Sequence, residues 1–81
     1  MARVSAKVDK DEDLVRFGAS VRARRQALGL SQEALADLAG IDRSHMGKLE
    51  RGERNLSFLN ILRIANAVHC KPSDLFVDAD L

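Results

Sequence analysis

Three helix starts of the same kind follow one another in the middle of this chain. Ser31, Asp42 and Ser57 are residue types whose side-chain oxygens accept hydrogen bonds from the free backbone N–H groups of a helix start. An apolar residue stands directly before each of them, and a second apolar residue lies five positions after the first one. This spacing is the hydrophobic staple, which fixes the angle at which a chain enters a helix. The three pairs are Leu30 with Leu35, Ile41 with Met46, and Leu56 with Ile61.

These starts predict three consecutive helices, at about 32–39, 43–50 and 58–68. An earlier helix is predicted by four apolar residues that lie on one helical stripe. They are Leu14, Phe17, Val21 and Leu28. Gly29 suits the end of that helix, and Pro72 suits the first turn of a fifth helix that carries Leu75 and Phe76 inward. The sequence therefore predicts an all-α domain of five helices.

A chain of 81 residues has room for one small domain. Its hydrophobic fraction of 46% is too high for a disordered segment, so we expect it to fold. We expect residues 1–11 to form a charged arm or a frayed helix start, because they show no apolar period. Residues 12–77 then form the domain, and residues 78–81 form an acidic tail.

Only Gly40, Ile41 and Asp42 separate the second and third predicted helices, so these helices must cross steeply. Ala36 offers a small side chain at the crossing, and Gly40 allows a positive φ in the turn. The apolar and small positions of this segment are Leu35, Ala36, Ala39, Gly40, Ile41, Met46 and Leu49. This pattern predicts a helix-turn-helix unit at 32–50.

The third predicted helix keeps a narrow, basic and polar face when its buried positions are removed. Residues near the start of a helix reach base edges when that helix enters the major groove of DNA. Arg43 can donate two hydrogen bonds to guanine, Ser44 can bond almost any base, and Lys48 lies one turn further on. Gly47 costs about 1 kcal/mol relative to alanine but permits close approach. We predict base contacts from Arg43, Ser44, His45 and Lys48, although each alone would be read as an ordinary solvated side chain.

Phosphate contacts are expected on both sides of this helix, because they position a protein on the duplex. Gln32 combines a side-chain amide with the positive end of a helix dipole. The loop after residue 50 supplies guanidinium and amide groups. The predicted phosphate contacts are Gln32, Arg51, Arg54, Asn55 and Arg22. For Arg22 and its neighbour Arg24, a solvated face is the alternative.

Glu50 would repel DNA if it were exposed, yet it adjoins the buried position Leu49. A partner inside the fold is the better interpretation, and Arg25 lies on the core-facing stripe of the first helix. We predict a partly buried ion pair between Arg25 and Glu50 that fixes the third helix against the first.

The net charge of +1 hides an uneven distribution along the chain. Residues 14–71 contain ten basic and five acidic side chains, a net charge of +5, whereas residues 9–13 and 72–81 each carry −3. We therefore expect a basic surface around the third helix. The low total charge predicts modest non-specific affinity and reliance on base contacts.

Residues 28–55 resemble the phage Cro and repressor type of helix-turn-helix protein. The matching segments read LGLSQEALADLAGI at 28–41 and DRSHMGKLERGERN at 42–55, and the resemblance extends over about 14–76. It implies a five-helix domain that binds operator DNA as a dimer. It also implies a phosphate contact from Gln32, base contacts from Arg43, Ser44 and Lys48, and an internal pair of Arg25 with Glu50.

Two further features bear on the resemblance. The small size and the segment GERNLS at 52–57 resemble restriction–modification controller proteins. His69 and Cys70 depart from the short apolar or glycine-containing link that the family commonly has before its last helix. A nucleophile or redox pair at His69 and Cys70 is disfavoured, because neighbouring residues point in different directions and no third group orients them.

The sequence predicts neither an enzyme nor a metal or cofactor site, because no catalytic constellation and no zinc spacing occurs. The single cysteine excludes an internal disulfide. No apolar run approaches the ~18 residues of a membrane span, and the N-terminus lacks the apolar core of a signal peptide. We therefore expect a cytoplasmic protein.

The combined interpretation is a transcriptional regulator that binds a palindromic operator as a homodimer, with helix 43–50 in the major groove. Autoregulation is the simplest form of control, since no small-molecule effector is evident. Apolar residues in the last two helices exceed the need of one small core and are expected at the dimer interface. They are Phe58, Leu59, Phe76, Val77 and Leu81. The alternative is an antitoxin or adaptor that mainly binds a protein partner.

Overall fold

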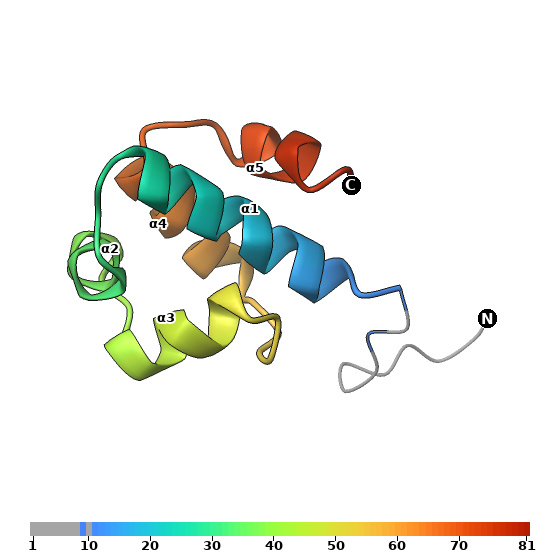
Figure 1. Cartoon of the computed structure of the whole chain (residues 1–81), viewed down its shortest axis with the longest axis horizontal. Coiled ribbons are helices and arrows are strands. Elements are labelled where there is room, and N and C mark those ends of the chain that lie inside the picture. Colours follow the sequence, from blue (N-terminus) through green and yellow to red (C-terminus); the bar gives the residue numbers. More distant parts are fainter. Residues whose placement is uncertain (1–8, 10) are drawn as a thin grey trace.

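The structure is a computed structural model that describes residue 9 and residues 11–81. Five α-helices and no strand occur in this part of the chain. They are α1 (Asp13–Ala27), α2 (Gln32–Ala39), α3 (Arg43–Glu50), α4 (Phe58–Ala67) and α5 (Pro72–Asp78). Figure 1 shows α1 running through the middle, with α3 on one side and α5 on the other. The predicted all-α, five-helix fold is confirmed. Of the predicted arm, residues 1–8 and 10 lie outside the described residues.

The three predicted N-cap residues all accept a hydrogen bond from the first turn of their helix. Ser31 caps α2, Asp42 caps α3 and Ser57 caps α4. The donors are the backbone N–H groups of Ala34, Ser44 and Asn60, at 3.0, 2.8 and 3.1 Å. As a result, α2 and α3 have the predicted bounds, and α4 ends one residue earlier than expected.

One aliphatic core lies between the helices. Its fully buried large side chains are Val21, Leu35, Met46, Leu49, Ile64 and Leu75. Phe17 and Phe76 add an aromatic contact between α1 and α5, with ring centroids 5.0 Å apart. The placement of Leu28 on the buried stripe of α1 was wrong. Because α1 ends at Ala27, the chain has already turned away at Leu28, and this side chain is exposed.

Each helix is followed by a residue with a left-handed backbone, at φ between 58° and 75°. These residues are Gly29, Gly40, Gly52, His69 and Asp80. The next residue then donates its backbone N–H to the carbonyl five positions earlier, at 2.9–3.1 Å. This is the Schellman arrangement, which satisfies carbonyl groups at a helix end. His69 and Asp80 take up a conformation that normally favours glycine.

This geometry explains two departures from the sequence expectations. His69 takes the left-handed position that a glycine occupies after α1, α2 and α3, and Cys70 still donates to the carbonyl of Ala65 at 3.0 Å. Residues 78–81 do not form a separate acidic tail. Asp78 is the last residue of α5, and the next residue, Ala79, is buried.

Two glycines permit close contact between α1 and the end of α3. A Cβ added to Gly18 would collide with the backbone carbonyl of Leu49 and would lie 2.6 Å from the carbonyl oxygen of Glu50. A Cβ added to Gly52 would lie 2.5 Å from the Cα atom of Val15. The helix pair α1 and α3 is therefore fixed at backbone-to-backbone distance. None of the helices in the described part of the chain is both long enough and apolar enough to span a membrane.

We expect His69→Gly to stabilise the protein by about 1 kcal/mol, because glycine adopts a left-handed backbone without steric cost. Gly40→Ala is the matched control. Gly40 has the same backbone conformation with open space around it, so alanine there should destabilise by about the same amount. Urea unfolding of both variants and the parent measures the two changes. A loss of stability in His69→Gly would contradict the assignment.

Candidate nucleic-acid interface

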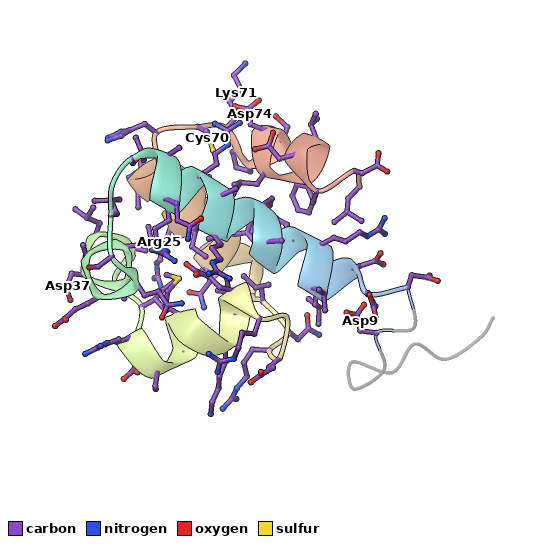
Figure 2. The ribbon with its side chains drawn as sticks, viewed as in Figure 1. Asp9, Arg25, Asp37, Cys70, Lys71 and Asp74 are labelled. Carbon is purple, nitrogen blue, oxygen red and sulfur yellow. The ribbon has the colours of Figure 1, made fainter. Side chains whose placement is uncertain are left out.

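A buried ion pair connects the end of α3 to α1. Arg25 Nε donates to Glu50 Oε2 at 2.7 Å, and Arg25 Nη2 donates to Glu50 Oε1 at 3.1 Å. The side chains are 11% and 1% exposed, respectively. Arg25 Nη1 also donates to the backbone carbonyl of Leu30 at 2.8 Å, so the guanidinium spans the turn before α2. Figure 2 shows Arg25 pointing from α1 toward α3.

Gln32 extends this ion pair to a third helix. Its side-chain Nε2 donates to Glu50 Oε1 at 3.0 Å. The carboxylate of Glu50 therefore receives donors from α1 and α2 while it lies on α3. This contact of Gln32, which was predicted to bind a phosphate only, could not be predicted from the sequence, since the two residues are 18 positions apart and no periodicity relates them.

A shallow hollow lies over the outer face of α3. It is lined by Gln32, Arg43, Ser44, Gly47, Lys48 and Arg51. Three of the four predicted base-contacting residues thus meet two of the predicted phosphate-contacting residues. The hollow contains three cationic side chains, from Arg43, Lys48 and Arg51. Its shape and charge suit a polyanion.

Polar side chains cover Gly47 at the middle of the hollow. A Cβ added there would lie 3.3 Å from Arg51 Nη1 and 3.5 Å from Gln32 Oε1. Gly47 is buried for this reason, although the sequence placed it on the open face. The absent side chain makes room for the Arg51 guanidinium on the surface of α3.

Ser44 is partly committed to its own helix cap. Its hydroxyl donates to Asp42 Oδ1 at 2.6 Å, and its backbone N–H donates to the same oxygen. These bonds, with the side-chain bond the largest cause, lower the pKa of Asp42 below its ordinary value. In this arrangement the Ser44 hydroxyl offers its lone pairs as acceptors. Ser44 can therefore bond only a donor group on a base, and not almost any base as the sequence predicted.

His45 does not line the hollow. Its Nε2 atom is buried and has no hydrogen-bond partner. His45 as a whole is half-buried. At 100° per residue it lies about 40° from Leu49 and about 60° from Lys48 around α3, at the border between the inner and outer faces. Its ring nitrogen is therefore not on the open face with Arg43, Ser44 and Lys48, and the base contact of His45 stays a prediction.

The remaining predicted phosphate contacts are exposed but do not line the hollow. Arg54 and Asn55 are exposed on the loop after α3. Arg22 is exposed one turn after Gly18, which touches the end of α3, so it emerges beside that helix. Arg24 is different, because its Nε donates to Asp78 Oδ2 of α5 at 2.7 Å.

Two carboxylates at the edge of the hollow were missed by the sequence analysis. Glu33 Oε2 lies 3.6 Å from Arg43 Nη1. Glu53 binds Arg51 more closely, with Nε donating to Oε2 at 2.8 Å and Nη2 donating to Oε1 at 3.3 Å. These hydrogen bonds lower the pKa of Glu53 and raise the pKa of Arg51. The spacing Arg-Gly-Glu, with Gly52 in a left-handed turn, is the sequence signal for this contact.

The described residues contain no group of three or more His, Cys, Asp or Glu side chains that could hold a metal ion. Cys70 is half-buried near the end of α4, and burial raises the pKa of its thiol. A raised pKa keeps the thiol protonated at neutral pH, which disfavours a nucleophilic role.

Comparisons with known proteins agree with this geometry. Residues 21–75 match the model of the helix-turn-helix family HTH_3. The control protein C.MunI from Mycoplasma sp is 33% identical over 67 residues, which cover 82% of this chain and 90% of that protein.

Two solved structures share the fold. The restriction–modification controller protein C.AhdI from Aeromonas hydrophila, known from a crystal structure, is 55% identical to this chain in sequence. Its TM-score is 0.78 over 79% of this chain and 97% of that chain. The c2 repressor protein of Salmonella phage P22, solved in complex with a synthetic operator, is 32% identical. Its TM-score is 0.69 over 73% of this chain and 89% of that chain.

We expect Glu50→Gln to destabilise the protein by about 3–5 kcal/mol, because it leaves the Arg25 charge buried without a carboxylate. The double variant Arg25→Met with Glu50→Leu should lose less than the single variant, since no charge remains buried. Asp13→Asn, which removes the exposed pair with Arg16, is the control and should change little. Chemical unfolding measures all of them. A loss below about 1 kcal/mol for Glu50→Gln would contradict a structural role for the pair.

Proposed function

The chain belongs to the helix-turn-helix family of DNA-binding transcriptional regulators, and from this premise we propose that it binds a specific palindromic operator as a homodimer. The observation that carries the proposal is the hollow over α3. Arg43, Ser44 and Lys48 share this one surface on a short helix that a buried ion pair holds in place. A rigid helix of this kind suits the major groove, which is about 12 Å wide.

The proposed roles follow from the position of each side chain. Arg43 and Lys48 are donors on the outer face of α3 and are assigned to base acceptors. Ser44 is assigned to a base donor, because its hydroxyl hydrogen is bonded to Asp42. Gln32 keeps one amide hydrogen beyond its bond to Glu50, and at the start of α2 it is assigned to a phosphate.

Backbone contacts on the other flank are assigned to Arg54 and Asn55, with Arg22 at the edge of the footprint. All three side chains are exposed. Phosphate contacts on both sides would fix the register of α3 in the groove. The c2 repressor of phage P22, solved with a synthetic operator, supports this mode of binding by its similarity.

Exposed apolar side chains support the homodimer. Phe58 and Leu59 at the start of α4 are 71% and 58% exposed, and Val77 and Leu81 near the end of α5 are 75% and 48% exposed. Leu81 also lines an apolar hollow with Leu56, Ile61 and Phe76. Phe76, which the sequence analysis added to this interface, is half-buried against Phe17 and belongs mainly to the core.

A partner that covers α5 would leave the DNA-facing surface open, since Figure 1 shows α5 and α3 on opposite sides of α1. Two recognition helices in one dimer would read half-sites about 34 Å apart. Occupancy of such an operator depends on the protein concentration through dimerisation as well as binding. This dependence suits autoregulation, as in a controller protein acting at its own promoter.

We expect selection of bound duplexes from a random pool to enrich a roughly palindromic motif. Arg43→Ala should lose preference at one base pair per half-site, at a cost of about 1–3 kcal/mol. Arg63→Ala, on the exposed surface of α4, is a control that should keep the motif. Absence of any enriched motif for the parent would contradict operator binding.

We expect the parent to sediment as a dimer at micromolar concentration and Val77→Asp to sediment as a monomer. A charge at this exposed position should break an apolar interface without harming the fold. Leu38→Asp is the matched control, because Leu38 is 63% exposed on α2, which carries none of the residues assigned to the interface. Equal masses for the parent and Val77→Asp would overturn the assigned interface.

A further inference from the structure

The ion pair between Arg51 and Glu53 lies at the edge of the hollow and contributes little to the stability of the fold. Both side chains are more than half exposed, at 57% and 53%. Exposed pairs of this kind stabilise proteins weakly, because water screens them. Yet the two residues form a two-point contact, whereas the pair of Arg43 with Glu33 is a single contact at 3.6 Å. The geometry of the guanidinium is therefore more closely fixed at Arg51 than at Arg43.

Glu53 occupies only one edge of the Arg51 guanidinium. An arginine side chain has five N–H donors in a rigid plane. The bonds to Glu53 use Nε and one hydrogen of Nη2, which leaves both hydrogens of Nη1 and the second hydrogen of Nη2. Nη1 and Nη2 together form the end of the fork. This end has the spacing that fits the O6 and N7 acceptors of guanine.

The free end of the Arg51 guanidinium lies over the outer face of α3. Arg51 Nη1 lies 3.3 Å from the point where a Gly47 Cβ would stand, and Arg51 lines the hollow beside Ser44 and Lys48. A side chain at position 47 would occupy this space. Gly47 thus opens the surface on which the guanidinium lies, and Glu53 fixes its orientation there.

From these contacts we infer that Arg51 reads a base pair in the major groove and that Glu53 is the residue that positions it. This inference rests on the proposed function and changes the role of Arg51 from a phosphate contact to a specificity-determining contact. Glu53 acts through Arg51 and touches no base itself. The carboxylate holds the Nε edge, so the end of the fork is presented to the groove in one orientation.

Bulk electrostatics gives the opposite expectation for Glu53. A carboxylate near DNA repels phosphates, so its removal should strengthen binding to every duplex alike. Positioning requires instead that Glu53→Gln weakens binding to the selected duplex. Affinity for a scrambled duplex of equal length and composition should stay equal or rise.

The test compares the full chain with Glu53→Gln, Arg51→Ala, the double variant and Asp37→Asn. Asp37→Asn is the matched control, because it makes the same charge change at an exposed position of α2 outside the hollow. Figure 2 shows Asp37 on the side of α2 that is turned away from the loop after α3. Each protein is measured against the duplex selected by the parent, its single-base variants and the scrambled duplex. Circular dichroism establishes that each variant is folded.

We expect Glu53→Gln to lower the ratio of specific to non-specific affinity about 10-fold, with the loss at one base pair per half-site. Arg51→Ala should lose preference at the same base pair, and the double variant should lose no more than Arg51→Ala alone. If Glu53→Gln changes the affinity for all duplexes equally, as Asp37→Asn does, the inference is overturned while operator binding stays intact. A parent that selects no motif would overturn the proposed function as well.

Discussion

The buried carboxylate of Glu50 is the constraint on which the position of α3 depends. Glu50 is the last residue of α3. Its carboxylate accepts two hydrogen bonds from Arg25 of α1 and a third from Gln32 of α2. A charge in the core is tolerated only when such donors surround it. Because those donors come from two other helices, α3 cannot rotate or slide without exposing an unpaired charge. The ion pair thus sets the orientation of the outer face of α3.

Glycines allow this arrangement at the points where backbones meet. Gly18 admits the last carbonyls of α3 against α1, and Gly52 admits the next turn against Val15. Gly47 clears the surface on which the Arg51 guanidinium lies. The same helix is therefore held rigidly on its inner side and left open on its outer side. Rigid presentation of a few donors is what base recognition requires, since binding then costs little ordering of the protein.

The sequence predicted the helix starts well because their causes are local. Ser31, Asp42 and Ser57 each cap the helix that follows at once. The ends of α4 and α5 were harder to predict, because His69 and Asp80 take a left-handed backbone that their residue types do not indicate. The pairing of Arg25 with Glu50 could be predicted from a charge beside a buried leucine. The bonds of Gln32 and Glu53, and the burial of the His45 ring nitrogen, depend on how the helices pack in space. The base and phosphate roles stay predictions.

The most direct test of this account is a crystal structure of the chain bound to the duplex it selects. We expect α3 in the major groove, with Arg43, Lys48 and Arg51 at base edges and the hydrogen bonds between Arg25, Glu50 and Gln32 unchanged from the free protein. Rotation of α3 relative to α1 on binding, or a different helix in the groove, would contradict the claim that the buried carboxylate presets the recognition surface.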